Sequence, residues 1–341
     1  MNSGLNLVRF FLAANVVAFH LWNSAAPGAG PVAVLGFFFI SGFLITQVVQ
    51  EVYVQPRSIG AFMLNRSLRI FPQYLAALGV GLVIIHAWPV VAFHINSYLR
   101  WPATVGEWLA QLTIFGLIDS NVRVLPAAWT LGTELYFYLL IGIVTGRSRR
   151  AALALCIVSV PVGVLCALDV LPFVFYGSAM GNGFVLALGS LAYFQRDAVR
   201  IRWPAFVLAL AAYFANLYLV PGLEHADVDR MNLTASVLPF SVILLFLVQH
   251  PMPRATRLAA LFDTLGKLAY PMFLLHWSVC VVLSVLFFHG QASFDEPGLV
   301  QGGRYFATMF LGVLSCSLVF YLLIDRPIEL LRRRVRGHAV A

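Results

Sequence analysis

Charged side chains are scarce in this sequence: they make up only 11% of its 341 residues, whereas 61% are hydrophobic. A soluble domain carries about 25% charged residues, so a soluble fold of this size could not cover its surface. The many Phe, Leu and Val residues exclude a disordered chain, and Gly and Pro follow no fibrous repeat. An integral membrane protein remains, and long continuous apolar runs favour a helical bundle over a β-barrel.

Cysteine is scarcer still, and its positions indicate neither a disulfide motif nor a metal site. The four residues, Cys156, Cys166, Cys280 and Cys316, lie inside apolar runs. None forms a CxxC pair or stands beside a histidine with the spacing of metal ligands. We therefore interpret all four as small core residues and predict no metal site.

Apolar stretches of about 20 residues, the length that crosses a bilayer as a helix, occur about ten times. We predict an all-α fold, a polytopic transmembrane bundle of about ten helices that forms a single domain over 1–341. No internal repeat is evident, and the longest connection, 94–126, is expected to hold a short amphipathic or re-entrant piece. The predicted spans are 5–22, 32–54, 73–93, 127–145, 151–168, 177–194, 203–221, 231–249, 268–288 and 305–324.

The basic residues are distributed in a way that predicts the orientation. Most of the 22 Lys and Arg residues fall in every second connection and in the tail 326–341. The other connections keep only Arg100, Arg123, Arg230 and Arg304. By the positive-inside rule, both termini are then cytoplasmic, in a multi-pass protein of the cytoplasmic membrane. The basic tail is expected to meet anionic lipid headgroups, so the net charge of +8 requires no nucleic-acid partner.

Ionisable residues inside a span need a reason, because each costs roughly 2.5–3.5 kcal/mol on insertion scales. Arg9 and His20 share the first predicted helix. Eleven residues return to nearly the same helical face, about 16 Å further along the axis. One stripe thus carries a cation near the cytoplasmic end and an imidazole near the outer end. The simpler alternative is that Arg9 snorkels to the surface and His20 sits at the outer interface.

Glu134 begins the fourth predicted span, about one and a half turns below the outer surface. His20 lies at a comparable depth by the same counting. A buried carboxylate needs a partner, and an imidazole is a suitable one. Histidine with a carboxylate is also the usual pairing of a base and the group that orients it. We therefore predict a catalytic pair, with a purely structural pair as the alternative.

Arg66 and Arg69 precede the third span at a spacing of three, which puts both guanidinium groups on one helical face. Two arginines on one face suit a phosphate-bearing ligand through bidentate contacts. Pro72 is expected to bend the entry into the span. The alternative is an ordinary basic cytoplasmic connection, which would carry such residues for orientation alone.

Two further stretches near the end of the chain carry polar residues. His276 lies mid-membrane, where a histidine more often hydrogen-bonds between helices than reacts, so we expect it to support the site. Asp325, Arg326 and Pro327 close the last span. We expect a helix-end ion pair there, with proline stopping the helix.

Taken in order, these stretches resemble the acyltransferase-3 family of integral membrane O-acyltransferases. The resemblance runs nearly end to end, and its order and spacing are more specific than any single piece. One position departs from the family pattern: Leu35 stands where members often have an acidic residue. The matching pieces are Arg9 with His20, Phe37 to Ile45, Arg66 to Pro72, Trp129 to Tyr138, Tyr270 to Trp277, and Asp325 to Pro327.

The resemblance implies acyl transfer from cytosolic acyl-coenzyme A, with acetyl as the default group. The acceptor would be a sugar hydroxyl of a surface or secreted polysaccharide, a glycolipid or a lipid-linked precursor. No permanently bound cofactor is implied. The residues expected to be catalytic are His20 and Glu134. Those expected to bind the donor are Arg9, Arg66 and Arg69, and those expected to support the site are Ser41, Trp129, Tyr138 and His276.

A transporter or exporter of a polar lipid or saccharide is the main alternative. It would also place ionisable groups inside membrane spans. It differs in predicting movement of substrate without consumption of coenzyme A thioester. The sequence leaves open the identity of the acceptor, the length of the acyl group, the leaflet of transfer, the choice between direct transfer and an acyl-histidine intermediate, and the oligomeric state.

Overall fold

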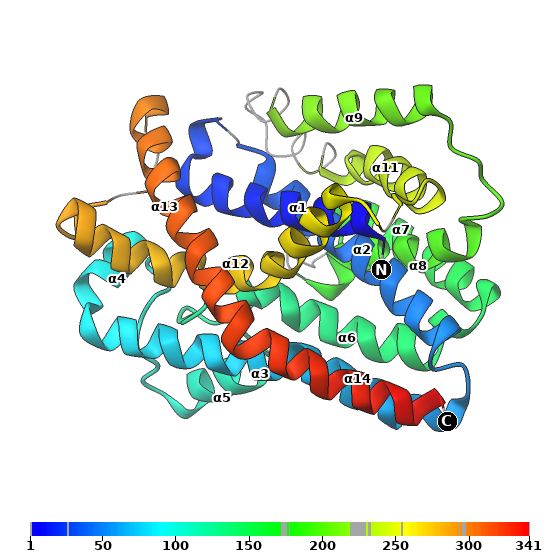
Figure 1. The fold of residues 1–341 in the computed structure, drawn as a ribbon, viewed down its shortest axis with the longest axis horizontal. Helices are drawn as coiled ribbons and strands as arrows, with labels where there is room; N and C mark the ends of the chain where they lie inside the picture. Colours follow the sequence, from blue (N-terminus) through cyan, green and yellow to red (C-terminus); the bar gives the residue numbers. More distant parts are fainter. Residues whose placement is uncertain are drawn as a thin grey trace.

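The computed structural model describes residues 2–25, 27–171, 176, 178–218, 230, 233–253, 255–292, 294 and 298–340. All regular secondary structure in these ranges is helical, as the composition predicted (Figure 1). The principal helices are α1 (Ser3–Leu21), α2 (Ala29–Glu51), α3 (Ile59–Ala87), α4 (Pro89–Ile95), α5 (Val105–Thr113), α6 (Trp129–Ile143), α7 (Arg149–Ala167), α8 (Ala179–Gln195), α9 (Trp203–Tyr218), α11 (Val237–Gln249), α12 (Arg257–Phe288), α13 (Leu299–Phe320) and α14 (Arg326–Val340).

Each of the ten predicted spans overlaps one of these helices. Six described helices are long and apolar enough to cross a membrane: α1, α2, α3, α7, α12 and the continuous run from α13 into α14. The helices α6, α8, α9 and α11 have 15, 17, 16 and 13 residues, shorter than the roughly 20 of a typical span. The chain is therefore an all-helical membrane protein, and the count of ten stays a prediction.

The helix α3 begins earlier than the sequence suggested. It runs from Ile59 to Ala87 and continues through Pro72, so the third span and the segment before it form one helix. Arg66 and Arg69 therefore lie on α3 itself rather than in a connection. The predicted start of the third span at residue 73 is therefore too late, since one missing N–H is tolerated where neighbouring helices hold the chain. The bend expected at Pro72 stays a prediction.

The last span also ends differently from the prediction. A π-helical segment, Tyr321–Asp325, joins α13 to α14, and Pro327 lies in the first turn of α14, where its missing N–H costs little. The helix therefore does not stop at proline. The tail predicted as 326–341 is mainly a helix that packs along α3 (Figure 1).

The connection 94–126 holds the short helix expected there. The helix α5 starts with a capping box, in which the Thr104 side chain accepts from Glu107 N–H and the Glu107 carboxylate accepts from Thr104 N–H. The N–H groups of Ala103 and Thr104 hold the pKa of the Glu107 carboxyl below its ordinary value, because they stabilise its charged form. This polar cap fixes where the helix begins.

Close packing of small residues joins α2 to α8. A Cβ atom at Gly42 would collide with the carbonyl oxygen of Leu186, and one at Gly189 would collide with that of Phe39. Beside this contact, the hydroxyls of Thr46 and Ser190 lie 2.7 Å apart and are buried. Small residues let helix backbones approach each other, as is common within membranes. The helix α1 packs extensively on α12 and also on α2.

Candidate active site

A buried carboxylate forms the centre of one polar cluster. Glu134, on α6, accepts hydrogen bonds from Ser41 Oγ on α2 at 2.7 Å and from Tyr138 OH at 3.0 Å. Tyr138 lies one turn further along α6, so its hydroxyl reaches back to the carboxylate. The sequence prediction placed both partners in the site, and the structure shows that they contact Glu134 directly.

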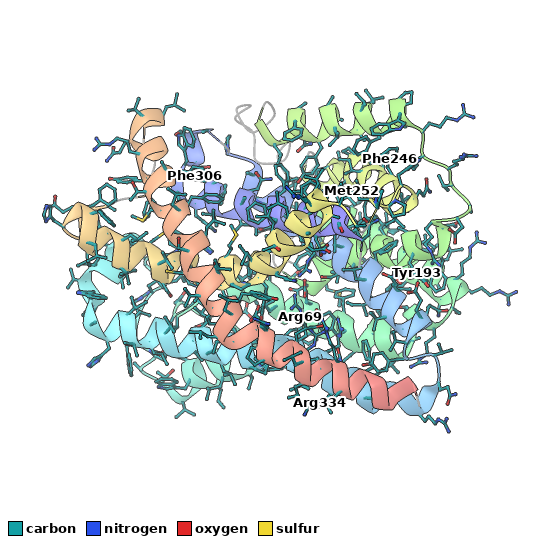
Figure 2. All side chains as sticks on the ribbon, in the orientation of Figure 1. Arg69, Tyr193, Phe246, Met252, Phe306 and Arg334 are labelled. Atoms are coloured by element: carbon teal, nitrogen blue, oxygen red, sulfur yellow. The ribbon has the colours of Figure 1, made fainter. Side chains whose placement is uncertain are left out.

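Three arginines lie near this carboxylate or its partner Tyr138. Arg9 on α1 interacts electrostatically with Glu134, Arg66 and Arg69, so helices far apart in the sequence bring their charges together. The Arg66 guanidinium lies 5.9 Å from the centroid of the Tyr138 ring, and Arg69 lies 5.3 Å from that of Tyr270. Figure 2 shows Arg69 near the middle of the molecule, close to where α13 leads into α14. We call Arg9, Arg66, Arg69 and Glu134 the arginine cluster.

The guanidinium groups of Arg9 and Arg69 keep their hydrogen-bond donors available. Both side chains are half-buried. Within the described part of the chain, neither forms a hydrogen bond or a salt bridge with a carboxylate within 4.0 Å. Arg66 differs, because its Nη2 donates to Asn65 Oδ1 at 3.2 Å. Half-buried guanidinium donors of this kind are well suited to an anionic ligand.

Asp325 joins the same region, although sequence reasoning expected only an ion pair at a helix end. Its side chain is 6% exposed and interacts electrostatically with Arg69, whereas its neighbour Arg326 is exposed. The predicted Asp325–Arg326 pair is therefore wrong. The π-helical segment adds a residue to the last turn, and Asp325 comes to face the bundle rather than the surface.

His20 belongs to a second cluster, made of rings. Its imidazole lies 5.3 Å from that of His276 and 4.8 Å from the Trp277 ring, measured between centroids. Phe19 packs against it edge-on at 5.1 Å. The side chain of His20 is half-buried, whereas His276 is fully buried. We call His20, His276 and Trp277 the histidine cluster.

The predicted pairing of His20 with Glu134 is not formed. Glu134 hydrogen-bonds to Ser41 and Tyr138, and its charge acts on Arg9 and Arg69. The two residues begin at a similar depth by counting, but depth does not specify which helix faces which. The helix α1 meets α12 over a long contact, so the neighbours of His20 come from α12 and not from α6.

The remaining predicted residue, Trp129, starts α6 and packs its ring on Tyr176 at 5.3 Å. This contact is separate from both clusters. Among the described residues, no group of three or more His, Cys, Asp or Glu side chains has an arrangement that could hold a metal ion. The clusters therefore offer guanidinium, carboxylate, hydroxyl and imidazole groups as their chemistry.

Comparison with known proteins adds the family. The family model of the acyltransferase-3 acyltransferase domain matches residues 2–322 of the chain. The chain belongs to the acyltransferase-3 family. It is also 25% identical over 327 residues to nodulation protein 10 of Rhizobium leguminosarum bv. viciae, covering 82% of this chain and 84% of that protein. No solved structure matches it.

For this acyltransferase, sequence reasoning missed several residues that complete the clusters. Tyr270 and Asp325 adjoin Arg69, and Trp277 adjoins His20. All three stand in the stretches that carry the family resemblance, which is the signal that could have found them. Their positions depend on contacts between distant helices, and no local spacing reveals such contacts.

Proposed function

We propose that this protein is a membrane O-acyltransferase that takes an acyl group, acetyl by default, from acyl-coenzyme A. The acceptor is a sugar hydroxyl of a polysaccharide, glycolipid or lipid-linked precursor. The observation that carries this proposal is the arginine cluster, in which Arg9 and Arg69 keep guanidinium donors for an anion. Coenzyme A carries several phosphates, so it has the charge that such a cluster binds.

The arrangement of α1 supports a path from donor binding to transfer. Arg9 and His20 lie on one helix, eleven residues and about 16 Å apart. With phosphates at the arginine cluster, the flexible arm of coenzyme A would extend along α1 and bring its thioester to His20. The cluster would face the cytoplasm, where coenzyme A is found, in a protein of the cytoplasmic membrane.

The transfer step follows from a histidine beside a thioester. His20 accepts the proton of the acceptor hydroxyl while the hydroxyl oxygen forms a bond to the thioester carbon. The carbon–sulfur bond then breaks, and the leaving thiolate takes the proton from His20. The products are an ester and free coenzyme A. In this proposal Glu134 acts through charge, since it offsets the repulsion among the three arginines when no donor is bound.

The first test is donor turnover. The wild type and His20→Ala, purified in detergent, receive acetyl-coenzyme A with a crude extract of envelope glycans, and the release of free thiol is followed against a sample without extract. Wild-type release with a loss of about 100-fold or more in the variant is expected, since proton transfer contributes that much. Undiminished release by folded His20→Ala would disprove the mechanism. Movement of saccharide across vesicles without thiol release would instead identify a transporter.

A further inference from the structure

The ring of His20 is held by other rings. In the described part of the chain its two nitrogens form no hydrogen bond, and Phe19, His276 and Trp277 pack around it. A histidine that accepts a proton during a reaction must present one nitrogen in a fixed direction. Since no carboxylate among the described residues contacts His20, we ask which described side chains orient it.

His276 is anchored more firmly than His20. Its Nδ1 lies 3.2 Å from the backbone oxygen of Met272 and 3.0 Å from that of Phe273. Carbonyl oxygens only accept hydrogen bonds, so Nδ1 carries the proton and donates it. The ring is fully buried, and every residue from Pro271 to Val281 on the same helix is buried as well. The plane of His276 is therefore fixed by α12.

This fixed plane lies against His20. The two imidazole rings are nearly parallel, at 14°, with centroids 5.3 Å apart, and Trp277 meets His20 at 52°. The two rings share no hydrogen bond, because Nδ1 of His276 donates to the backbone of α12 and its Nε2 has no partner among the described residues. What His276 offers is a fixed ring, which limits rotation of His20.

We propose that His276 is a positioning residue for His20, and that it works through its ring face. The proposal rests on the function proposed above, in which His20 accepts the proton of the acceptor hydroxyl. The backbone of α12 holds His276, His276 and Trp277 hold His20, and the nitrogens of His20 stay free for substrate. The two adjacent side chains thus replace the carboxylate that orients histidine in many other enzymes.

Three substitutions of His276 distinguish the role of its ring from that of its nitrogens. His276→Phe keeps a ring and removes both nitrogens, His276→Asn keeps an N–H donor near Nδ1 and removes the ring, and His276→Ala removes both. With acetyl-coenzyme A and the glycan extract, Ala and Asn should lower kcat about 10- to 100-fold, the range for a misplaced reacting group, with an unchanged KM for acetyl-coenzyme A. Phe should keep most of the wild-type kcat.

A contrary pattern would overturn the proposal. If Phe were as slow as Ala while Asn stayed active, a nitrogen of His276 and not its face would matter. Phe240→Leu serves as a packing control, because Phe240 is a buried ring between Phe39 and Tyr213, away from the histidine cluster. Phe240→Leu should lower the stability of the protein about as much as His276→Ala does and should keep the wild-type kcat.

A chemical probe tests the positioning without turnover. Diethyl pyrocarbonate modifies accessible imidazole nitrogens, and mass spectrometry gives the rate at each histidine. His20 should react several-fold faster in His276→Ala than in the wild type or His276→Phe, with the exposed His86 and His94 as internal references. An equal His20 rate in all three would disprove positioning by the ring. Full activity of His20→Ala would disprove the proposed role of His20 in transfer and leave this measurement of its packing valid.

Discussion

At the scale of single residues, Arg69 has the most distinctive surroundings in the arginine cluster. It lies over the Tyr270 ring and interacts with Asp325, but it forms no hydrogen bond in the described part of the chain. Arg66, three residues earlier, is tied to Asn65. The sequence treats the two arginines alike, whereas the structure distinguishes a half-buried guanidinium with available donors from one that already serves the fold.

We expect Arg69→Ala to raise the KM for acetyl-coenzyme A. A hydrogen bond to a charged group contributes about 1.5–3 kcal/mol, which corresponds to an increase of roughly 10- to 150-fold. Initial rates of thiol release over a range of acetyl-coenzyme A concentrations measure it. Arg304→Ala is the matched control, since Arg304 is exposed and was predicted on the opposite side of the membrane. An unchanged KM in Arg69→Ala would remove this residue from donor binding.

At the scale of elements, the contact between α2 and α8 depends on glycine residues, which have no side chain. Gly42 and Gly189 each face a backbone oxygen of the other helix, and a backbone cannot move aside as the end of a flexible side chain can. The hydrogen bond between Thr46 and Ser190 lies in the same contact. This packing holds the helix that carries Ser41, one of the partners of Glu134.

Gly189→Ala should therefore destabilise the protein, although alanine favours helices. Overpacking costs about 1–3 kcal/mol, more than the gain of roughly 1 kcal/mol in helix propensity. We expect the melting temperature in detergent to fall by several degrees, measured by tryptophan fluorescence. Gly79→Ala, also within a helix but with nothing within 4 Å of its new Cβ, should be neutral or slightly stabilising. Equal melting temperatures for the two variants would contradict this packing argument.

The helix α14 is held against α3 by a buried arginine, which its basic composition does not reveal. Arg332 is buried, and its Nη2 and backbone oxygen both bond to Asn65 on α3, at 3.2 Å each, while its Nη1 donates to Glu329 at 2.6 Å. Its neighbour Arg333 is largely exposed. The tail that was expected to meet anionic lipid headgroups thus contains one arginine that serves tertiary structure.

Arg332→Ala should loosen α14 and make it more sensitive to trypsin, because it removes the hydrogen bonds that the Arg332 side chain donates to Asn65 and Glu329. A hydrogen bond to a charged group contributes about 1.5–3 kcal/mol. The rate of cleavage within 326–341, followed by mass spectrometry, should rise several-fold. Arg333→Ala removes the same charge from the next position and should change little. Similar rates in both variants would mean that the Asn65 contact does not hold the helix.

At the scale of the whole molecule, the orientation in the membrane stays a prediction from charge. The arginine cluster, with Arg66 and Arg69 on α3, would then face the coenzyme A pool. The helix α5 would lie on the opposite side, because it follows the third span. The proposed function requires this orientation, since the donor is made in the cytoplasm.

Labelling tests the orientation. Val105→Cys places a thiol at the exposed start of α5, and we expect it to react with a membrane-impermeant maleimide added to intact cells. Arg334→Cys, in the exposed part of α14, should react only after the cells are opened. The wild type, with its native cysteines, gives the background. The reverse pattern would place the arginine cluster outside and exclude a cytosolic donor.

Sequence by itself determined the class of protein and the first candidates for its site. A chain with 11% charged and 61% hydrophobic residues can be stable only where lipid covers it, and backbone groups in lipid require helices. Arginine, histidine and glutamate inside apolar runs are costly enough to stand out. The stretches that carry them also identified the family, because their order along the chain is a one-dimensional property.

Only the tertiary structure decided which of these residues meet. Periodicity gives the depth and face of a side chain on its own helix, but not which helix lies opposite. Glu134 and His20 matched in depth, yet the first faces Ser41 and Arg9, and the second faces His276. The choice depends on side-chain packing between helices, such as the glycine contact of α2 with α8, and that packing is fixed by shape rather than by spacing.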